Sequence, residues 1–343
     1  MQARVLHNMI QLQGETMRVY FWGTRGSLPA SMTEAVVRQK IFRALKEAKA
    51  MNIKNDGDIE KFVDGLPFDV RGTYGTNTSC VEIRNGEEYI ICDAGTGLRD
   101  LGNHHMKLVE QGLKSATGSV FNIFISHFHW DHIQGFPFFT PAYIAGNKLR
   151  VLSFHENLQD HFIKQQSSPY FPVPLAGMQA DIEFVSLKPG EHYEIGGFTV
   201  FGIEQMHPGV SFGYRFQKDG KSVVYSSDAE HKTSYESFAR DDNYPFLDFF
   251  KEADLLIFDA QYDWNDVVLS KDDWGHSSFV PAVELGAKAN VKHLCLFHNE
   301  PAYSDERLLA LLNDTKNYLK VYNNHRLHPM KIDLAYDGFE IEV

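Results

Sequence analysis

The segment "SHFHWDHIQGF" at residues 126–136 constrains this chain most, because it places three histidines and an aspartate within six positions, directly after the apolar run "VFNIFI". Side chains at i and i+2 of an extended segment point the same way, so His127 and His129 can direct imidazole nitrogens at one metal ion, ~2.0 to 2.1 Å away. If the chain then turns into a helix, Asp131 and His132 face a neighbouring point. The spacing therefore predicts two adjacent metal sites at the end of a strand in a rigid sheet.

Runs rich in β-branched and aromatic residues recur along the chain and alternate with helical patterns. Strands are expected at 18–23, 79–84, 88–95, 120–127, 149–154, 181–187, 192–203, 212–227, 253–260, 293–298 and 331–343, with hairpins at the "GG" of 192–203 and the "DG" of 212–227. Helices are expected at 34–51, 97–112, 276–290 and 304–320. Several strands are apolar on both faces and need cover on each side, so we expect an α/β fold of four layers, an αββα sandwich. No linker or repeat marks a boundary, so we assign 17–343 to one domain and 1–16 to a leader of uncertain order.

Two segments stand outside this alternation. Residues 30–70 form a charged helical insert in which Val37, Ile41 and Leu45 recur at helical spacing, which predicts a cap packed on the main body. Residues 165–178 contain three prolines and are expected to form an ordered loop. Each segment either walls a substrate pocket or only covers the core.

The composition of the chain limits the classes of molecule that we expect it to bind. The formal net charge of −12 predicts that long nucleic acid and anionic membranes are repelled, so we expect neither as a partner, while a short ligand at a local positive site is compatible. The N-terminal residues lack the apolar stretch of a signal peptide, and no later segment is apolar over a length that spans a bilayer. Cys80, Cys92 and Cys295 fit reduced thiols better than a disulfide framework. These features predict a cytoplasmic protein, and they leave a homodimer open.

Three more side chains that can bind metal follow predicted strands: His207, Asp228 and His298. Functional residues gather at such positions because a rigid sheet holds the loops there. This series, HxHxDH followed by His, Asp and His at successive strand ends, resembles the metallo-β-lactamase fold superfamily over residues 17–343. The resemblance implies the αββα sandwich, a first metal on His127, His129 and His207, a second on Asp131, His132 and His298, and Asp228 bridging both.

Further motifs indicate a branch of that superfamily. The segments "FWGTRGSLP", "YGTNTSCVEI", "ICDAGTGLRDLG", "DWGHSS" and "FHNEPAYSDERL" resemble the ribonuclease Z-like and cyclic-nucleotide phosphodiesterase branch. In that branch the histidine that matches His276 assists the chemistry without binding metal, and we group it with Asp131 and Asp228 as catalytic. Asp93 in "CDAG" is expected to accept a hydrogen bond from a metal-binding histidine. The chain lacks the basic, Gly-rich arm of ribonuclease Z enzymes that process transfer RNA, so that substrate is not expected.

Charge favours a phosphate substrate. Two divalent ions, two aspartates and a bridging hydroxide leave about one positive charge, which attracts a phosphodiester monoanion. We therefore predict a metal-dependent hydrolase of a small phosphodiester, such as a cyclic nucleotide or cyclic dinucleotide, with the bridging hydroxide as nucleophile and His276 as acid or leaving-group stabiliser. Zn²⁺ is the expected metal, with Mn²⁺ or Fe²⁺ as alternatives. Two other functions stay open: acyl hydrolysis of a β-lactam or thioester at the same site, and a non-catalytic sensor of nucleotide or metal.

Overall fold

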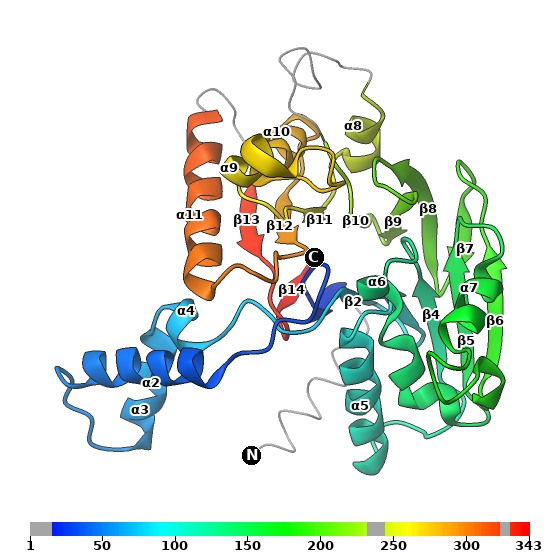
Figure 1. The fold of residues 1–343 in the computed structure, drawn as a ribbon, viewed down its shortest axis with the longest axis horizontal. Helices are drawn as coiled ribbons and strands as arrows, with labels where there is room; N and C mark the ends of the chain where they lie inside the picture. The colour runs from blue at the N-terminus through cyan, green and yellow to red at the C-terminus, as the bar shows by residue number, and fades with distance from the viewer. Residues whose placement is uncertain (1–15, 232–243, 323–329) are drawn as a thin grey trace.

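The computed structural model describes residues 16–231, 244–322 and 330–343. Two seven-stranded sheets lie at its centre (Figure 1). The first has the strand order β14-β1-β2-β3-β4-β5-β6 and the second the order β13-β12-β11-β10-β9-β8-β7. In each sheet, four consecutive strands are parallel and the remaining pairings are antiparallel.

The strands match the expected runs, except that the run 331–343 divides into two strands, which lie in different sheets. The first sheet comprises β1 (Arg18–Gly23), β2 (Cys80–Arg84), β3 (Tyr89–Cys92), β4 (Val120–Phe124), β5 (Lys148–Ser153), β6 (Asp181–Ser186) and β14 (Glu340–Glu342). The second comprises β7 (Tyr193–Ile195), β8 (Phe198–Gln205), β9 (Ser211–Lys218), β10 (Lys221–Ser226), β11 (Leu255–Asp259), β12 (His293–Phe297) and β13 (Lys331–Leu334). Both predicted hairpins form, and Asp219 and Gly220 at the second turn both have positive φ, as a tight two-residue hairpin turn requires.

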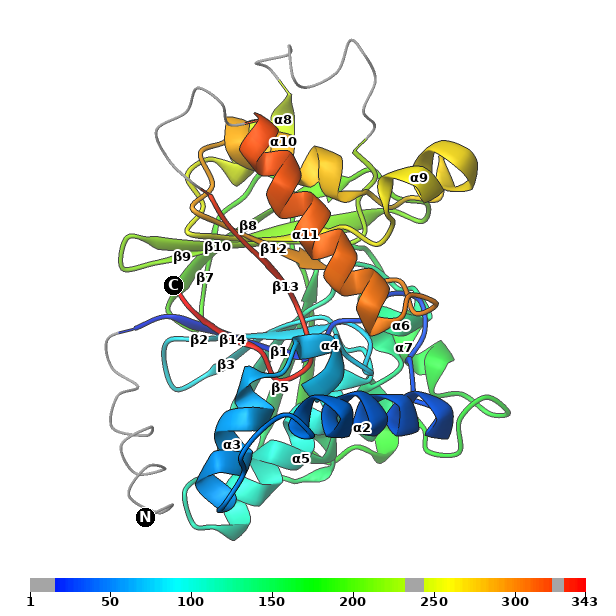
Figure 2. The same cartoon turned by 90° about the vertical axis from the view of Figure 1, so that its left-hand side faces the viewer.

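The helices either pack on the outer faces of the two sheets or extend to one side of them. They are α2 (Glu34–Ala48), α3 (Asp56–Gly65), α4 (Phe68–Arg71), α5 (Gly97–Glu110), α6 (Trp130–Ile133), α7 (Leu158–Gln165), α8 (Pro245–Phe250), α9 (Trp264–Asp266), α10 (Phe279–Lys288) and α11 (Asp305–Tyr322). One buried cluster joins side chains of both sheets, including Phe124 and Tyr214. A second cluster joins the second sheet to α8, α10 and α11, and a third joins the first sheet to α5 and α7. Figure 2 shows these layers from α10 and α11 through the two sheets to α5, which confirms the predicted four-layer αββα sandwich.

The helical insert departs from its prediction. Helices α2 and α3 extend to one side of the sandwich (Figures 1 and 2), and they contain no buried residue. The expected apolar stripe is exposed instead, with Ile41 at 55% and Leu45 at 66%. Charged side chains of α2 make contacts with the body instead: Lys40 pairs with Asp305 at 2.7 Å. The spacing of apolar residues identified the helix correctly. It did not identify the side of α2 that contacts the body, because ion pairs rather than apolar side chains make that contact.

Two strands end three residues earlier than expected, so the residues that follow them lie in loops. Asp93 and His127 are among these loop residues. β3 stops at Cys92 and β4 at Phe124, and the backbone NH of Ser126 then donates to Asp93 at 2.7 Å. The segment 165–178 forms a loop with one short 3₁₀ turn, as predicted. Within the three described ranges, no helix combines the length and apolarity that a bilayer crossing needs. Residues 1–15 of the expected leader lie outside the described residues.

Candidate metal centre

All seven predicted metal ligands converge on one place, where strand ends of the two sheets meet. The loop after β4 carries His127 and His129, and α6 carries Asp131 and His132. The second sheet contributes His207 after β8, Asp228 after β10 and His298 after β12. Their side chains form two overlapping groups, and within each group the candidate ligand atoms lie within 4.8 Å of one another.

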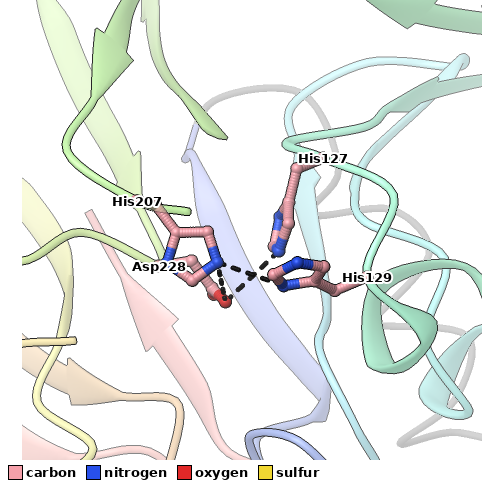
Figure 3. Close-up of side chains that lie close together, drawn as sticks. All are labelled: His127, His129, His207 and Asp228. Carbon is pink, nitrogen blue, oxygen red and sulfur yellow. Dashed lines mark hydrogen bonds and ion pairs between the residues drawn. The ribbon is translucent and has the colours of Figure 1, made fainter. Parts of the chain in front are cut away.

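The first group comprises His127, His129, His207 and Asp228, whose side chains point toward one another from separate segments (Figure 3). His207 Nε2 lies 3.1 Å from His129 Nδ1. Oδ2 of Asp228 lies 3.5 Å from His127 Nε2 and 3.8 Å from His207 Nε2. This group therefore presents three imidazole nitrogens and one carboxylate oxygen around a common point.

The second group comprises Asp131, His132, His298 and again Asp228. The other oxygen of Asp228, Oδ1, lies 3.1 Å from His132 Nε2 and 3.2 Å from His298 Nε2. Oδ2 of Asp131 lies 3.1 Å from His298 Nε2. Asp228 thus divides its two oxygens between the groups, which is the geometry that a bridging ligand needs.

Most of these imidazoles have a partner on the nitrogen that faces away from the cluster. His132 Nδ1 lies 2.7 Å from Asp93 Oδ2, which is the contact expected of Asp93. His207 Nδ1 donates to the Gly275 carbonyl at 2.8 Å, and His298 Nδ1 lies 3.0 Å from Gln261 Oε1. Such contacts fix the orientation of each ring and leave Nε2 to bind metal.

The backbone at three of these residues is strained. Asp93, Asp228 and His298 all have positive φ, between 48° and 64°, although none is glycine. This region costs residues with a Cβ about 1 to 3 kcal/mol and persists where the surroundings impose it, most often at functional sites. The strain aims these three side chains into the site directly from strand ends.

The electrostatics of the centre fit a divalent cation. Three carboxylates, those of Asp93, Asp131 and Asp228, are at most 5% exposed. Burial opposes charge on His132, but Asp228, Asp131 and Asp93 together outweigh it and raise the pKa of His132 well above its usual range. Burial also lowers the pKa of His127 well below its usual range, which favours the neutral form that binds metal. The buried Nε2 of His127 has no hydrogen-bond partner among the described residues, and a bound cation would satisfy it.

His276 lies beside these two groups, and its candidate ligand atom lies within 4.8 Å of those of Asp259 and His298. Its ring centroid lies 5.1 Å from that of His207 and 5.0 Å from that of His298. His276 Nδ1 lies 2.8 Å from Oδ2 of Asp259. Burial opposes the charged imidazole, but the charge and hydrogen bond of Asp259 outweigh it and raise the pKa of His276 to about 9. Asp259 was not among the predicted site residues, although it lies at the end of a predicted strand, the same signal that identified His298.

Two polar side chains in loops near the site, those of Arg25 and Asn77, make contacts within the protein. Arg25 is buried, and its guanidinium donates to the carbonyl oxygens of Gly75 and Glu300. Asn77 donates from Nδ2 to a carboxylate oxygen of Asp100 at 2.7 Å. Both residues therefore fix loops near the site, and we assign neither of them to the substrate.

Comparison with known proteins agrees with this geometry. The model of the beta-lactamase superfamily domain matches residues 88–299. Ribonuclease Z of Picrophilus torridus is 25% identical over 282 residues, which cover 66% of this chain and 83% of that protein. The solved metallo-beta-lactamase fold protein YhfI of Bacillus subtilis has a TM-score of 0.61 at 15% identity and covers 96% of this chain and 100% of its own. The short form of human tRNase Z has a TM-score of 0.56 at 18% identity, over 94% of this chain and 98% of its own.

These relatives correct one prediction. We expected no long nucleic acid as a partner, and this is wrong, because the relatives that align over most of the chain are named as ribonucleases. The error lies in the use of the net charge of −12, which sums over the whole surface and does not describe the field at one site. A buried, metal-binding cluster attracts phosphate locally whatever the distant surface carries.

The matched domain spans more than half of the chain, and the fold and strand-end residues agree with it. The chain therefore belongs to the beta-lactamase superfamily, as a metal-dependent hydrolase of its ribonuclease Z-like and phosphodiesterase branch.

Proposed function

We propose that this protein is a dinuclear metal-dependent hydrolase of phosphodiesters and that residues 17–343 act as one catalytic domain. The observation that supports this most is the division of Asp228 between two ligand groups. One ion would bind the imidazoles of the first group and a second the remaining ligands, with Zn²⁺ favoured by the imidazole-rich donor set and Mn²⁺ or Fe²⁺ as alternatives. When bound, such a pair lowers the pKa of water toward ~7 and offsets the charge of a phosphate group.

The chain itself supplies the proton for the leaving group. Asp259 raises the pKa of His276 to about 9, so the imidazole is protonated at neutral pH. A protonated histidine next to the cluster can donate to the oxygen that departs from phosphorus. Two backbone donors, the NH groups of Ala229 and Gln261, fix the Asp259 carboxylate at 3.0 and 3.1 Å. His276 is therefore the acid of the proposed reaction, and Asp259 keeps it charged and oriented.

Two substrate classes follow from different observations. The ribonuclease names of the relatives support RNA. A small diester, such as a cyclic nucleotide or cyclic dinucleotide, is a second candidate, because the exposed neighbours of the site residues include apolar side chains. These are Leu28, Trp130, Met206 and Trp274, exposed by 63%, 76%, 46% and 55%. Exposed aromatic side chains near site residues in the sequence, such as Trp130, are suited to the stacking of a base.

The expected compartment is reducing. Cys80, Cys92 and Cys295 are buried and free. Free thiols are typical of proteins in the cytosol, where disulfides rarely persist. We therefore place the enzyme in the cytoplasm.

The test is a hydrolysis assay with purified protein loaded with Zn²⁺ or Mn²⁺. The substrates are bis-para-nitrophenyl phosphate, a 2′,3′-cyclic nucleotide, a cyclic dinucleotide and an RNA with a 3′ extension. We expect diester cleavage by the wild type, a loss of about 100-fold or more in His276→Ala, and no loss in His192→Ala. His192 is the matched control because it is an exposed histidine just before β7, outside the cluster.

The outcomes separate the alternatives. Cleavage of a β-lactam or thioester without cleavage of any diester would overturn the proposal in favour of acyl hydrolysis. Binding of a nucleotide that is equal in wild type and His276→Ala, with no turnover of any substrate, would instead indicate a sensor.

A further inference from the structure

A cavity of about 350 Å³ lies directly beside His276. His276 and His231 line it together with an apolar wall that includes Trp264, Val267 and Pro281. The acidic residues Glu230 and Asp272 also line it. Its volume lies within the range of about 300 to 1,000 Å³ that small-molecule sites occupy. Because the ring of His276 also adjoins the rings of His207 and His298, one side chain borders both the metal centre and this cavity. We name this space the His276 cavity.

The apolar wall is held in place by its own segment. Trp264 opens α9, where the side chain of Asp263 accepts from the NH of Asp266 at 2.9 Å. Arg307 in α11 donates to the Asp266 carboxylate at 2.8 Å. These contacts fix the short helix that carries the indole, and Trp264 itself is 37% exposed. A flat aromatic ring at the edge of a cavity offers a stacking surface to a planar ligand.

The polar side of the cavity adds an edge for hydrogen bonding. His231 is 2% exposed, and its Nδ1 lies 2.7 Å from the hydroxyl of Tyr244. Burial lowers the pKa of His231 to about 3, so the ring is neutral at physiological pH. Its Nε2 has no hydrogen-bond partner within the part of the chain that the structure describes. Buried polar atoms are normally satisfied, so this nitrogen points to a ligand group.

His231 and His276 are also fixed relative to each other. The backbone NH of His231 donates to Oγ of Ser277, the residue after His276, at 2.9 Å. The cavity therefore combines a stacking surface, a neutral hydrogen-bonding imidazole and the proposed acid in one rigid arrangement. A ligand that fits these three features has a planar ring to stack, polar ring edges to form a hydrogen bond with the imidazole, and an attachment close to the scissile bond beside the proposed acid.

We infer that the His276 cavity binds the nucleobase of the nucleoside that leaves, with Trp264 as the stacking surface and His231 as a contact to the base edge. The inference rests on the proposed function. Water forms the new bond to phosphorus, the bond from phosphorus to the nucleoside oxygen breaks, and that oxygen takes a proton from His276, which water later restores. Because the His276 ring borders both the metal-binding cluster and the cavity, a nucleoside attached to phosphorus at the cluster on that side reaches the cavity.

The test compares two substrates and three variants. The substrates are uridylyl-(3′→5′)-uridine and a counterpart in which hydrogen replaces the base of the leaving nucleoside. The variants are Trp264→Ala, Trp264→Phe and Leu269→Ala, the last as a control because Leu269 is 81% exposed in the same segment and does not line the cavity. Products are measured by mass spectrometry.

We expect Trp264→Ala to lower kcat/KM for the dinucleotide about tenfold, as the loss of one base stack would, with Trp264→Phe within about threefold of wild type. Leu269→Ala should match wild type, and the three variants should differ little on the abasic counterpart. Equal kcat/KM of wild type and Trp264→Ala on the dinucleotide would overturn the inference while leaving the proposed hydrolysis intact. If the wild type cleaves neither substrate, the proposed function and this inference fail together.

Discussion

Nδ1 of His276 lies 2.8 Å from Oδ2 of Asp259, and both side chains are buried beside the metal-binding cluster. Burial alone would lower the pKa of His276, but the carboxylate reverses the sign and raises the pKa to about 9. The pair is therefore charged at neutral pH. Its stabilising effect is fully present below the unfolded pKa of about 6.5 and is lost as pH rises through about 9.

Replacing Asp259 by asparagine tests this pair. In Asp259→Asn the pKa of His276 should fall, so that the acid is deprotonated at neutral pH and kcat at pH 8 falls about 100-fold. The alkaline limb of the pH profile of kcat, expected near pH 9 in the wild type, should move to lower pH. Asp333→Asn is the matched control, because Asp333 pairs with His293 at 3.0 Å in β12 and β13, outside the cluster. An alkaline limb that stays in place in Asp259→Asn would contradict the assignment.

Metal content tests the bridging role of Asp228. Elemental analysis of the wild type should give two divalent ions per chain. Asp131→Ala removes a carboxylate from one group only and should keep about one ion, whereas Asp228→Ala removes an oxygen from each group and should keep less than one. Prolonged chelation should abolish diester cleavage, and added Zn²⁺ or Mn²⁺ should restore it. Retention of two tightly bound ions by Asp228→Ala would refute the bridge.

Asp93 provides a graded test of ligand orientation. Its carboxylate accepts from the NH and Oγ of Ser126, at 2.7 and 2.8 Å, from the hydroxyl of Tyr225 at 2.7 Å, and contacts His132. Asp93→Asn should weaken metal affinity about 10- to 100-fold, since one acceptor oxygen and the negative charge are lost behind His132. Tyr225→Phe removes one hydrogen bond from the same carboxylate and should cost less. Competition with a chromogenic chelator measures both, and equal affinities in all three proteins would exclude the proposed role.

Local sequence patterns predicted much of the fold, because the spacing of apolar residues and the residue types of a turn depend on only a few neighbouring positions. The hairpin at Asp219 and Gly220 and the strand-end ligands His207 and His298 all followed from such patterns. The positive φ of Asp228, by contrast, carries no sequence signal, because neighbouring structure imposes it. The same holds for Arg25, whose partners Gly75 and Glu300 are distant in sequence.

The role of Asp259 shows a different limit. Its strand was predicted, but its function appears only when β11 and the segment before α10 bring it to His276, 17 residues away. An aspartate at a strand end is common, and only the partner distinguishes a functional one. The expectation that long nucleic acid is not a partner was wrong for a related reason, since net charge is a property of the whole chain and the site depends on a few buried groups.

The exposed face of α2 gives the last prediction, which concerns stability. Asp305, at the start of α11, pairs with Lys40 of α2 and accepts hydrogen bonds from Thr73 and the NH of Tyr74, and its side chain is 5% exposed. Asp305→Ala leaves the Lys40 ammonium, 11% exposed, without this partner and should lower the free energy of unfolding by about 3 kcal/mol. Phe42→Ser on the outward face, where Phe42 is 67% exposed, should change it by less than about 0.5 kcal/mol.

Urea denaturation of both variants measures the two free energies. The predicted order is opposite to the order that apolar packing of α2 would produce, because packing would make Phe42 the more important residue and the ion pair a minor one. A larger loss in Phe42→Ser than in Asp305→Ala would mean that the outward face of α2 is covered in solution. If the predicted order is found, charged groups attach α2 to the body. The buried carboxylate of Asp305, at the start of α11, then links α2 to α11 and to the loop before β2.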